Sequence, residues 1–127
     1  MKHQAIRPFL AIAAACLACR AIAAEPALIA YPASTEIPAS ITLIKKSDKI
    51  GRDQAFSSGY RPQLVFSAMK SDVSCTVKVP KPKEQVEPGE TAEVVINCIE
   101  AFKIIEGKPE FVVLEGGRKV GEGKLLH

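Results

Sequence analysis

The sequence predicts an all-β domain of six antiparallel strands, arranged as a barrel or a sandwich. Short apolar runs rich in Val, Ile and Phe recur over residues 41–126, and several of them alternate with polar positions. Turn residues, drawn from 8 Gly and 9 Pro, separate these runs. No stretch keeps the 3.6-residue apolar period of an amphipathic helix. The length of 127 residues suits one domain.

Six segments have the composition of strands, with turn signals between them. The predicted strands are Ile41–Lys45, Gln63–Ala68, Cys75–Val79, Ala92–Ile99, Glu110–Leu114 and Lys119–Leu126. The turns are marked by Gly51, by Gly59 with Pro62, by Pro80 and Pro82, by Pro88 and Gly89, by Gly107 with Pro109, and by Gly116 and Gly117. Short strands at this spacing are typical of antiparallel sandwiches and barrels.

The chain begins with a segment typical of an export signal. Residues 1–24 combine a basic start, an apolar run over residues 9–18, and small residues before Glu25. We therefore expect residues 1–24 to be a signal peptide, and the protein to be exported in soluble form to the periplasm or the medium. Lipidation at Cys16 or Cys19 is a less favoured alternative, because neither has Leu three positions before it.

The net charge of +3 comes from this leader. It carries three basic residues and no acid, so residues 25–127 hold 17 − 3 = 14 basic and 14 acidic residues. A neutral mature chain argues against a broad basic surface for nucleic acid or anionic membranes. Residues 25–40 are rich in proline and predict an extended lead-in, either a tether or an extra edge strand.

Two cysteines, Cys75 and Cys98, lie outside the leader. An exported domain with an even pair of cysteines favours one disulfide. Placing the two opposite each other in an antiparallel pair puts Val77 opposite Ile96 on the same core-facing side. The alternative is two buried free thiols. A metal site is not expected, because no His lies near either cysteine.

The sequence offers no recognisable catalytic arrangement. The single His outside the leader is the C-terminal His127, so neither a Ser/His/Asp nor a Cys/His set is available there. The acids of residues 84–93 gather around one turn beside lysines and predict a solvated surface. A hydrolase using a carboxylate pair is the remaining enzymatic alternative. We expect a non-enzymatic protein without cofactor or metal.

Five short sequence motifs follow one another along the chain in a characteristic order. They are Gly51–Arg52, Gly59–Gln63 (Gly-Tyr-Arg-Pro-Gln), Ser71–Ser74 (Ser-Asp-Val-Ser), Glu87–Glu90 (Glu-Pro-Gly-Glu) and Glu115–Gly123 (Glu-Gly-Gly-Arg-Lys-Val-Gly-Glu-Gly). In this order and spacing they resemble the third, C-terminal domain of elongation factor Tu. The resemblance covers about Ile41 to Leu126 and implies a six-stranded antiparallel β-barrel.

The resemblance also implies contact positions. In that family the barrel packs on the GTPase domain and contacts the T-stem backbone of aminoacyl-tRNA. The positions that match the RNA-facing sites are Arg52, Arg61, Gln63, Ser74 and Glu115. The structural alternative is that Arg61 and Gln63 fix the loop before a strand, and that the Glu-Gly-Gly-Arg string makes a tight hairpin turn.

The sequence departs from the family in three ways. Cys75 stands where the family commonly has Gly, and Met69–Lys70 resembles a one-residue insertion. The sequence also contains neither a Gly-x-x-x-x-Gly-Lys-Ser/Thr phosphate loop nor an Asn-Lys-x-Asp string, so GTP binding is not expected.

Together these features predict an exported β-barrel that serves as a binding or structural module of the envelope and contacts another protein through its loops and strand edges. One alternative is a cytoplasmic translation-factor-like protein that keeps its leader and binds tRNA. Another is a secreted inhibitor or immunity-type protein that blocks a toxin or an enzyme.

Overall fold

The computed structural model describes residues 25–127, so the expected signal peptide with Cys16 and Cys19 lies outside the described residues. Residues 25–127 form ten strands and no helix, and hence no helix that could span a membrane. The strands are β1 (Leu28–Tyr31), β2 (Glu36–Leu43), β3 (Phe56–Ser57), β4 (Gln63–Phe66), β5 (Val73–Lys78), β6 (Gln85–Val86), β7 (Thr91–Cys98), β8 (Phe102–Ile105), β9 (Glu110–Glu115) and β10 (Arg118–Leu125).

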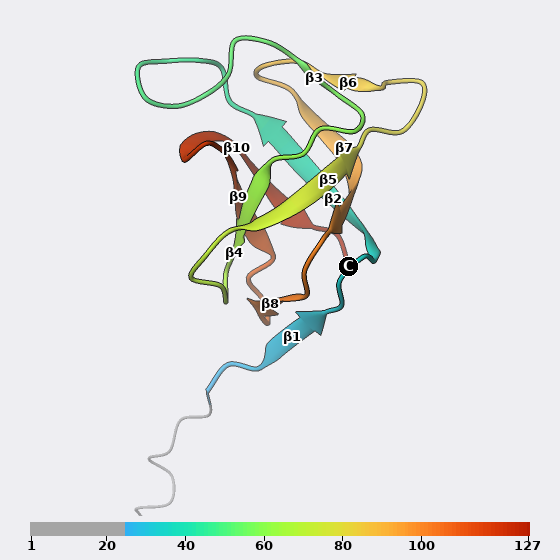
Figure 1. The fold of residues 1–127 in the computed structure, drawn as a ribbon, viewed down its shortest axis with the longest axis vertical. Coiled ribbons are helices and arrows are strands. Elements are labelled where there is room, and N and C mark those ends of the chain that lie inside the picture. The colour runs from blue at the N-terminus through green and yellow to red at the C-terminus, as the bar shows by residue number, and fades with distance from the viewer. Residues whose placement is uncertain (1–24) are drawn as a thin grey trace, which may run out of the picture.

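Six of these strands close into an antiparallel barrel in the order β10-β2-β7-β5-β4-β9 (Figure 1). They correspond to the six predicted strands, so the all-β barrel is confirmed. Buried and outward-facing positions alternate most regularly in β2 and β7, because successive side chains of a strand point to opposite faces of a sheet, whereas a bulge between Lys119 and Gly121 interrupts the alternation in β10. The two-stranded pairs β1–β8 and β3–β6 lie at opposite ends of the barrel in Figure 1.

The boundaries at the start of the barrel differ from the prediction. The proline-rich stretch of residues 25–40 contains β1, an edge strand, and residues 36–40 of β2. Pro38 is tolerated inside β2 because its backbone faces the end of β10, where its carbonyl accepts the N–H of Leu126 at 2.9 Å. Of the two alternatives for residues 25–40, the structure shows the extra edge strand, β1, whereas the short strands β3, β6 and β8 were missed, since two to four residues carry no readable alternation.

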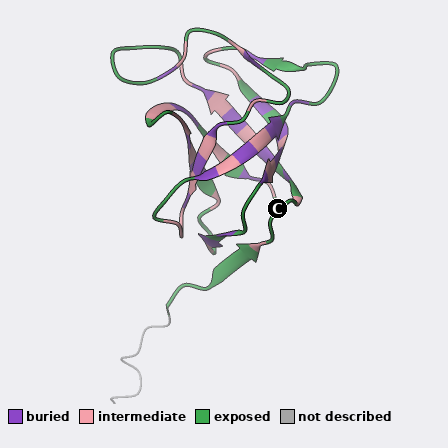
Figure 2. Cartoon of the chain, in the orientation of Figure 1, coloured by how far each residue is buried: buried purple, intermediate pink, exposed green. Residues whose placement is uncertain are grey.

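The core is apolar throughout, and among residues 25–127 no polar or charged side chain is fully buried. Phe66, the last residue of β4, is fully buried in this core. Its ring stacks on Phe102 at 3.8 Å between centroids and meets Phe111 at 5.5 Å. Since Phe102 belongs to β8, the β1–β8 pair closes the lower end of the barrel in Figure 1. Figure 2 shows how the buried residues concentrate on the barrel strands.

A disulfide joins Cys75 of β5 to Cys98 of β7. The two residues are direct partners in the antiparallel register, and Val77 lies opposite Ile96. Both cysteine side chains are buried in the core. The predicted bridge and its register are therefore confirmed.

Candidate functional site

The positions suggested by the resemblance gather around one end of the barrel. Gln63 at the start of β4 lies opposite Ser74 of β5 on one side and Leu114 of β9 on the other. Residues directly opposite in an antiparallel pair point to the same face. All three are partly exposed, so they form a row on the outer surface, and Glu115 follows Leu114 directly.

Arg52 reaches this end from the loop between β2 and β3. Its N–H donates to the Ile44 carbonyl at 2.9 Å, and it forms an isolated bridge with Lys45. Gly51 makes this close return possible. Its φ is +86°, and a Cβ there would lie 2.1 Å from the Lys45 carbonyl oxygen. The Gly51–Arg52 string therefore has a structural reason, which is to bring the loop back onto β2.

Arg118, at the start of β10, holds the same loop from the other side. Its Nε donates to the Gly51 carbonyl at 2.9 Å. Its Nη2 donates to the carbonyls of Ser47 at 2.9 Å and Ile50 at 2.8 Å. A guanidinium suits this task because its donors spread in a rigid plane. Arg118 follows Gly116 and Gly117, whose φ values of +55° and +84° form the tight turn between β9 and β10.

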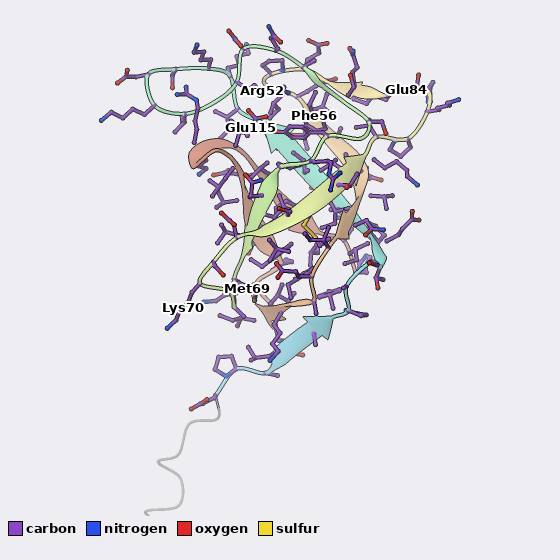
Figure 3. All side chains as sticks on the ribbon, in the orientation of Figure 1. Arg52, Phe56, Met69, Lys70, Glu84 and Glu115 are labelled. Carbon is purple, nitrogen blue, oxygen red and sulfur yellow. A yellow bond between two sulfur atoms is a disulfide. The ribbon has the colours of Figure 1, made fainter. Side chains whose placement is uncertain are left out.

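Glu115 accepts from two partners at once. The Arg52 Nε lies 3.3 Å from Glu115 Oε2, and the Tyr60 hydroxyl donates to the same oxygen at 2.5 Å. Arg52 also lies over the Tyr60 ring, with Cζ 5.1 Å from the centroid, and its Nη1 donates to the Ala55 carbonyl at 3.1 Å. Phe56 also stacks on Tyr60, with 4.4 Å between the two ring centroids. Figure 3 shows Arg52, Phe56 and Glu115 together at this end.

The charges of Arg52 and Glu115 and the titration of Tyr60 favour one fixed arrangement of these three side chains. Burial, followed by the hydrogen bond to Glu115, raises the pKa of Tyr60 far above its ordinary value. Tyr60 is therefore a neutral donor throughout the physiological range. The arginine and the carboxylate satisfy each other, with 25% and 35% of their side chains exposed. A hydroxyl bound to a carboxylate contributes about 1.5–3 kcal/mol, more than an exposed ion pair does.

Arg61 differs from Arg52. It is exposed, and among the described residues no hydrogen bond or ion pair holds its guanidinium. The backbone around it is fixed instead. Tyr60 bridges to Val77, and the Pro62 carbonyl accepts the Cys75 N–H at 3.1 Å. Its side chain is thus presented to solvent from a rigid segment.

Among the hollows on the surface of residues 25–127, one contains two of the suggested positions and a larger one contains none. The smaller, of about 290 Å³, is polar and is lined by Arg52, Glu115, Arg118, Lys46 and Asp53 among others. The larger, of about 800 Å³, lies on the outer face of β2, β4, β9 and β10, and none of the five suggested positions lines it. Within residues 25–127 no group of three or more His, Cys, Asp or Glu side chains is placed to hold a metal.

Sequence reasoning missed the two residues that organise this end. Tyr60 was noted only within the Gly59–Gln63 string, and it both packs against the core and donates its hydroxyl to Glu115. Arg118 was seen only as part of a hairpin string, yet it clamps the loop that carries Arg52. Both residues lie inside motifs noted in the sequence, but their hydrogen-bond partners are known only once the loop of residues 44–52 is folded.

Comparison with known families identifies the family to which the barrel belongs. The family model described as the elongation factor Tu C-terminal domain matches residues 31–127. The match therefore includes all six barrel strands, and it begins at the last residue of β1.

Proposed function

Since the chain belongs to the family of the elongation factor Tu C-terminal domain, we propose that it is a non-enzymatic binding module of this type that acts outside the cytoplasm and binds another protein. The proposed contact is the end surface formed by Arg61, Gln63, Ser74 and Leu114, called here the Gln63 surface. It takes its shape from three neighbouring strands and the rigid segment before β4.

The observation that carries this proposal is the pairing of Arg52 with Glu115. Two of the five positions that match RNA-facing sites of the family are bound to each other here. A phosphate would have to replace a carboxylate that is also held by Tyr60. The Gln63 surface is left with one cation, uncharged hydrogen-bonding groups and an aliphatic side chain. This mixture is typical of protein interfaces rather than of a nucleic-acid surface.

The disulfide supports a site of action outside the cytoplasm. Disulfides persist in oxidising compartments and are rare in the cytoplasm. Both sulfurs of the Cys75–Cys98 bridge are buried between barrel strands, as expected for a structural bridge. Together with the export signal predicted from residues 1–24, the bridge supports a site of action in the periplasm or outside the cell.

The proposal is tested by site-specific photo-crosslinking in the native cells. A photoreactive residue replaces Gln63 in one variant and Lys70, which lies at the opposite end in Figure 3, in a matched control. We expect one protein partner to be captured from position 63 and not from position 70. Equal capture from both positions, or capture of RNA from position 63, would contradict the proposal.

Family membership and the exposed Arg61 favour tRNA binding as a second candidate. It predicts an affinity for aminoacyl-tRNA that falls with salt, because phosphate contacts release counterions. Arg61→Ala should then weaken binding at all salt concentrations, whereas Lys70→Ala should not. Absence of tRNA binding at low salt removes this candidate.

Compartment is measured separately, by intact mass of the native protein from envelope and cytoplasmic fractions. We expect a chain that begins near Glu25, found outside the cytoplasm, and about 2 Da lighter before reduction than after it. A full-length, reduced chain in the cytoplasm would overturn the proposed site of action and favour tRNA. A tight one-to-one complex with a toxin or an enzyme would specify the binding module as an inhibitor.

A further inference from the structure

The outer edge of β1 presents unpaired backbone groups. β1 pairs with β8 on one side and with no other strand of residues 25–127. The Glu106 N–H donates to the Ala27 carbonyl at 2.9 Å, so Ala27 faces β8. Backbone groups alternate in direction along a strand. Leu28 and Ala30 therefore direct their N–H and C=O groups outward.

The direction of a backbone N–H in β8 supports these directions in β1. Ile105, the partner of Leu28, donates its N–H to the Ser67 hydroxyl at 2.8 Å, away from β1. In Figure 1 β1 lies at the lower end of the molecule, and Leu28 to Ala30 are exposed, whereas Tyr31 is half-buried against Phe102 (Figure 2). The free edge is thus open to solvent on the described part of the chain.

Two prolines bracket this edge. Pro26 and Pro32 continue the outward-facing positions on either side of Leu28 and Ala30. Proline has no N–H, so the edge offers N–H donors only at residues 28 and 30. The outward-facing positions 26, 28, 30 and 32 are thus no donor, donor, donor and no donor, and this order is the same when the strand is read from either end.

The edge also lacks the charged residues with which proteins usually protect such strands. No charged side chain occurs between Glu25 and Glu36. Instead 57% of Leu28 and 38% of Ile29 is exposed. Edge strands are normally blunted by short length, prolines, lysines, inward-pointing charges or bulges, because an open edge pairs with other strands; β1 has only the first two, which confine its open edge to Leu28 and Ala30.

We propose that β1 pairs with β1 of a second copy of this chain, antiparallel and about a twofold axis at Ile29. Leu28 then lies opposite Ala30 of the second copy, and each such pair exchanges two hydrogen bonds. In this register Pro26 meets Pro32 of the second copy, so no outward N–H faces a proline. The product is a four-stranded sheet in the order β8-β1-β1-β8.

A second copy is the favoured occupant because the edge is complementary to itself. A twofold dimer requires that the same patch serve both partners. The palindromic order of donors around Ile29 meets this requirement without a change in the strand. An edge contact of four residues is smaller than a standard interface of roughly 1,600 Å², so we expect half-dimerisation at a concentration on the order of 0.1 mM.

The test compares two substitutions at Ala30 by sedimentation velocity over about 5 µM to 1 mM protein. Ala30→Pro removes one outward donor and no β1–β8 hydrogen bond. Ala30→Val keeps the donor and suits a strand. We expect the dimer of Ala30→Pro to be at least tenfold weaker than wild type, and that of Ala30→Val to stay within about threefold.

Amide hydrogen exchange in the same samples locates the contact. The amides of Leu28 and Ala30 should exchange more slowly as concentration rises, while those of Ile29 and Tyr31 stay protected at all concentrations by β8. Loss of protection at Ile29 and Tyr31 in Ala30→Pro would mean that β1 has detached. In that case the Ala30→Glu variant is used to test the dimer. Lys103 of the same chain lies opposite Ala30, so it can pair with the new carboxylate and keep β1 on β8.

Ala30→Glu brings two carboxylates near each other across the proposed twofold, so its dimer should be weaker than wild type and recover with salt. A monomer at every concentration would overturn the proposal. So would equal dimerisation of the Pro and Val variants. Protection of Leu28 and Ala30 that does not depend on concentration would also overturn it, because residues 1–24 or another part of the chain would then cover the edge.

Discussion

Reduction of the Cys75–Cys98 bridge should lower the free energy of unfolding by about 3.4 kcal/mol. The bridge closes a loop with a sequence separation of 23 residues. In the chain-entropy model such a cross-link removes about 11.5 cal/mol/K from the unfolded chain, which at 25 °C gives the figure above. Both sulfurs are buried between directly opposed residues of β5 and β7, so little else in the folded barrel changes on reduction.

The assay is equilibrium unfolding in urea, followed by circular dichroism, with and without a thiol reductant. The oxidised protein should show the higher midpoint. The reduced protein should show the steeper dependence on urea, because its unfolded chain is less compact. A Cys75→Ala, Cys98→Val double variant is the control. It should match the reduced protein to within about 1 kcal/mol and should not respond to reductant.

Two outcomes would refute the reasoning. A difference below about 1 kcal/mol between oxidised and reduced protein would mean that the bridge does not constrain the unfolded chain. A reductant effect of equal size in the double variant would show that the effect does not come from these sulfurs.

Three further changes test the end of the barrel that carries Arg52. Gly51→Ala should cost at least about 2 kcal/mol in urea unfolding, because a side chain at φ +86° is strained and its Cβ meets the Lys45 carbonyl. Tyr60→Phe should cost about 1.5–3 kcal/mol at pH 7, since Glu115 loses a donor. The folded pKa of Tyr60 is raised above its unfolded value of 10.0, so wild type should lose stability as the pH rises above about 10, and Tyr60→Phe should lose less; parallel curves for the two proteins would contradict this. Arg118→Ala should speed amide exchange across residues 47–51 while leaving the exchange of β5 and β7 unchanged, and uniform faster exchange would argue against a local clamp.

The barrel strands could be predicted because their sequences alternate over enough residues to be read. β7 alternates along its full length, and the same pattern places Cys98 on the face that Cys75 shares. β2 was only half recognised, because Pro38 argues against a central strand unless the position of the end of β10 is known. β3 and β6 are two residues each, and no periodicity exists at that length.

The sequence motifs of the candidate site could be recognised, but the contacts between their side chains could not be predicted. Arg52 and Glu115 were singled out from residues far apart in the chain, but nothing local indicates that they bind each other. Their contact depends on the return of the loop at Gly51 and on the clamp formed by Arg118. Long-range pairing of polar groups across loops carries no sequence period, so it becomes visible only in the folded chain.

The closure of the barrel by its last strand determines when the protein can fold. β10 lies between β2 and β9, so residues 39–43 meet residues 121–125. A chain still growing on the ribosome lacks this strand, and both neighbouring strands keep open edges until it emerges. We therefore expect the barrel to close only once β10 is available, because its contacts join residues far apart in the sequence. A truncation before Arg118 should leave two open edges and give an aggregating fragment instead of a smaller barrel.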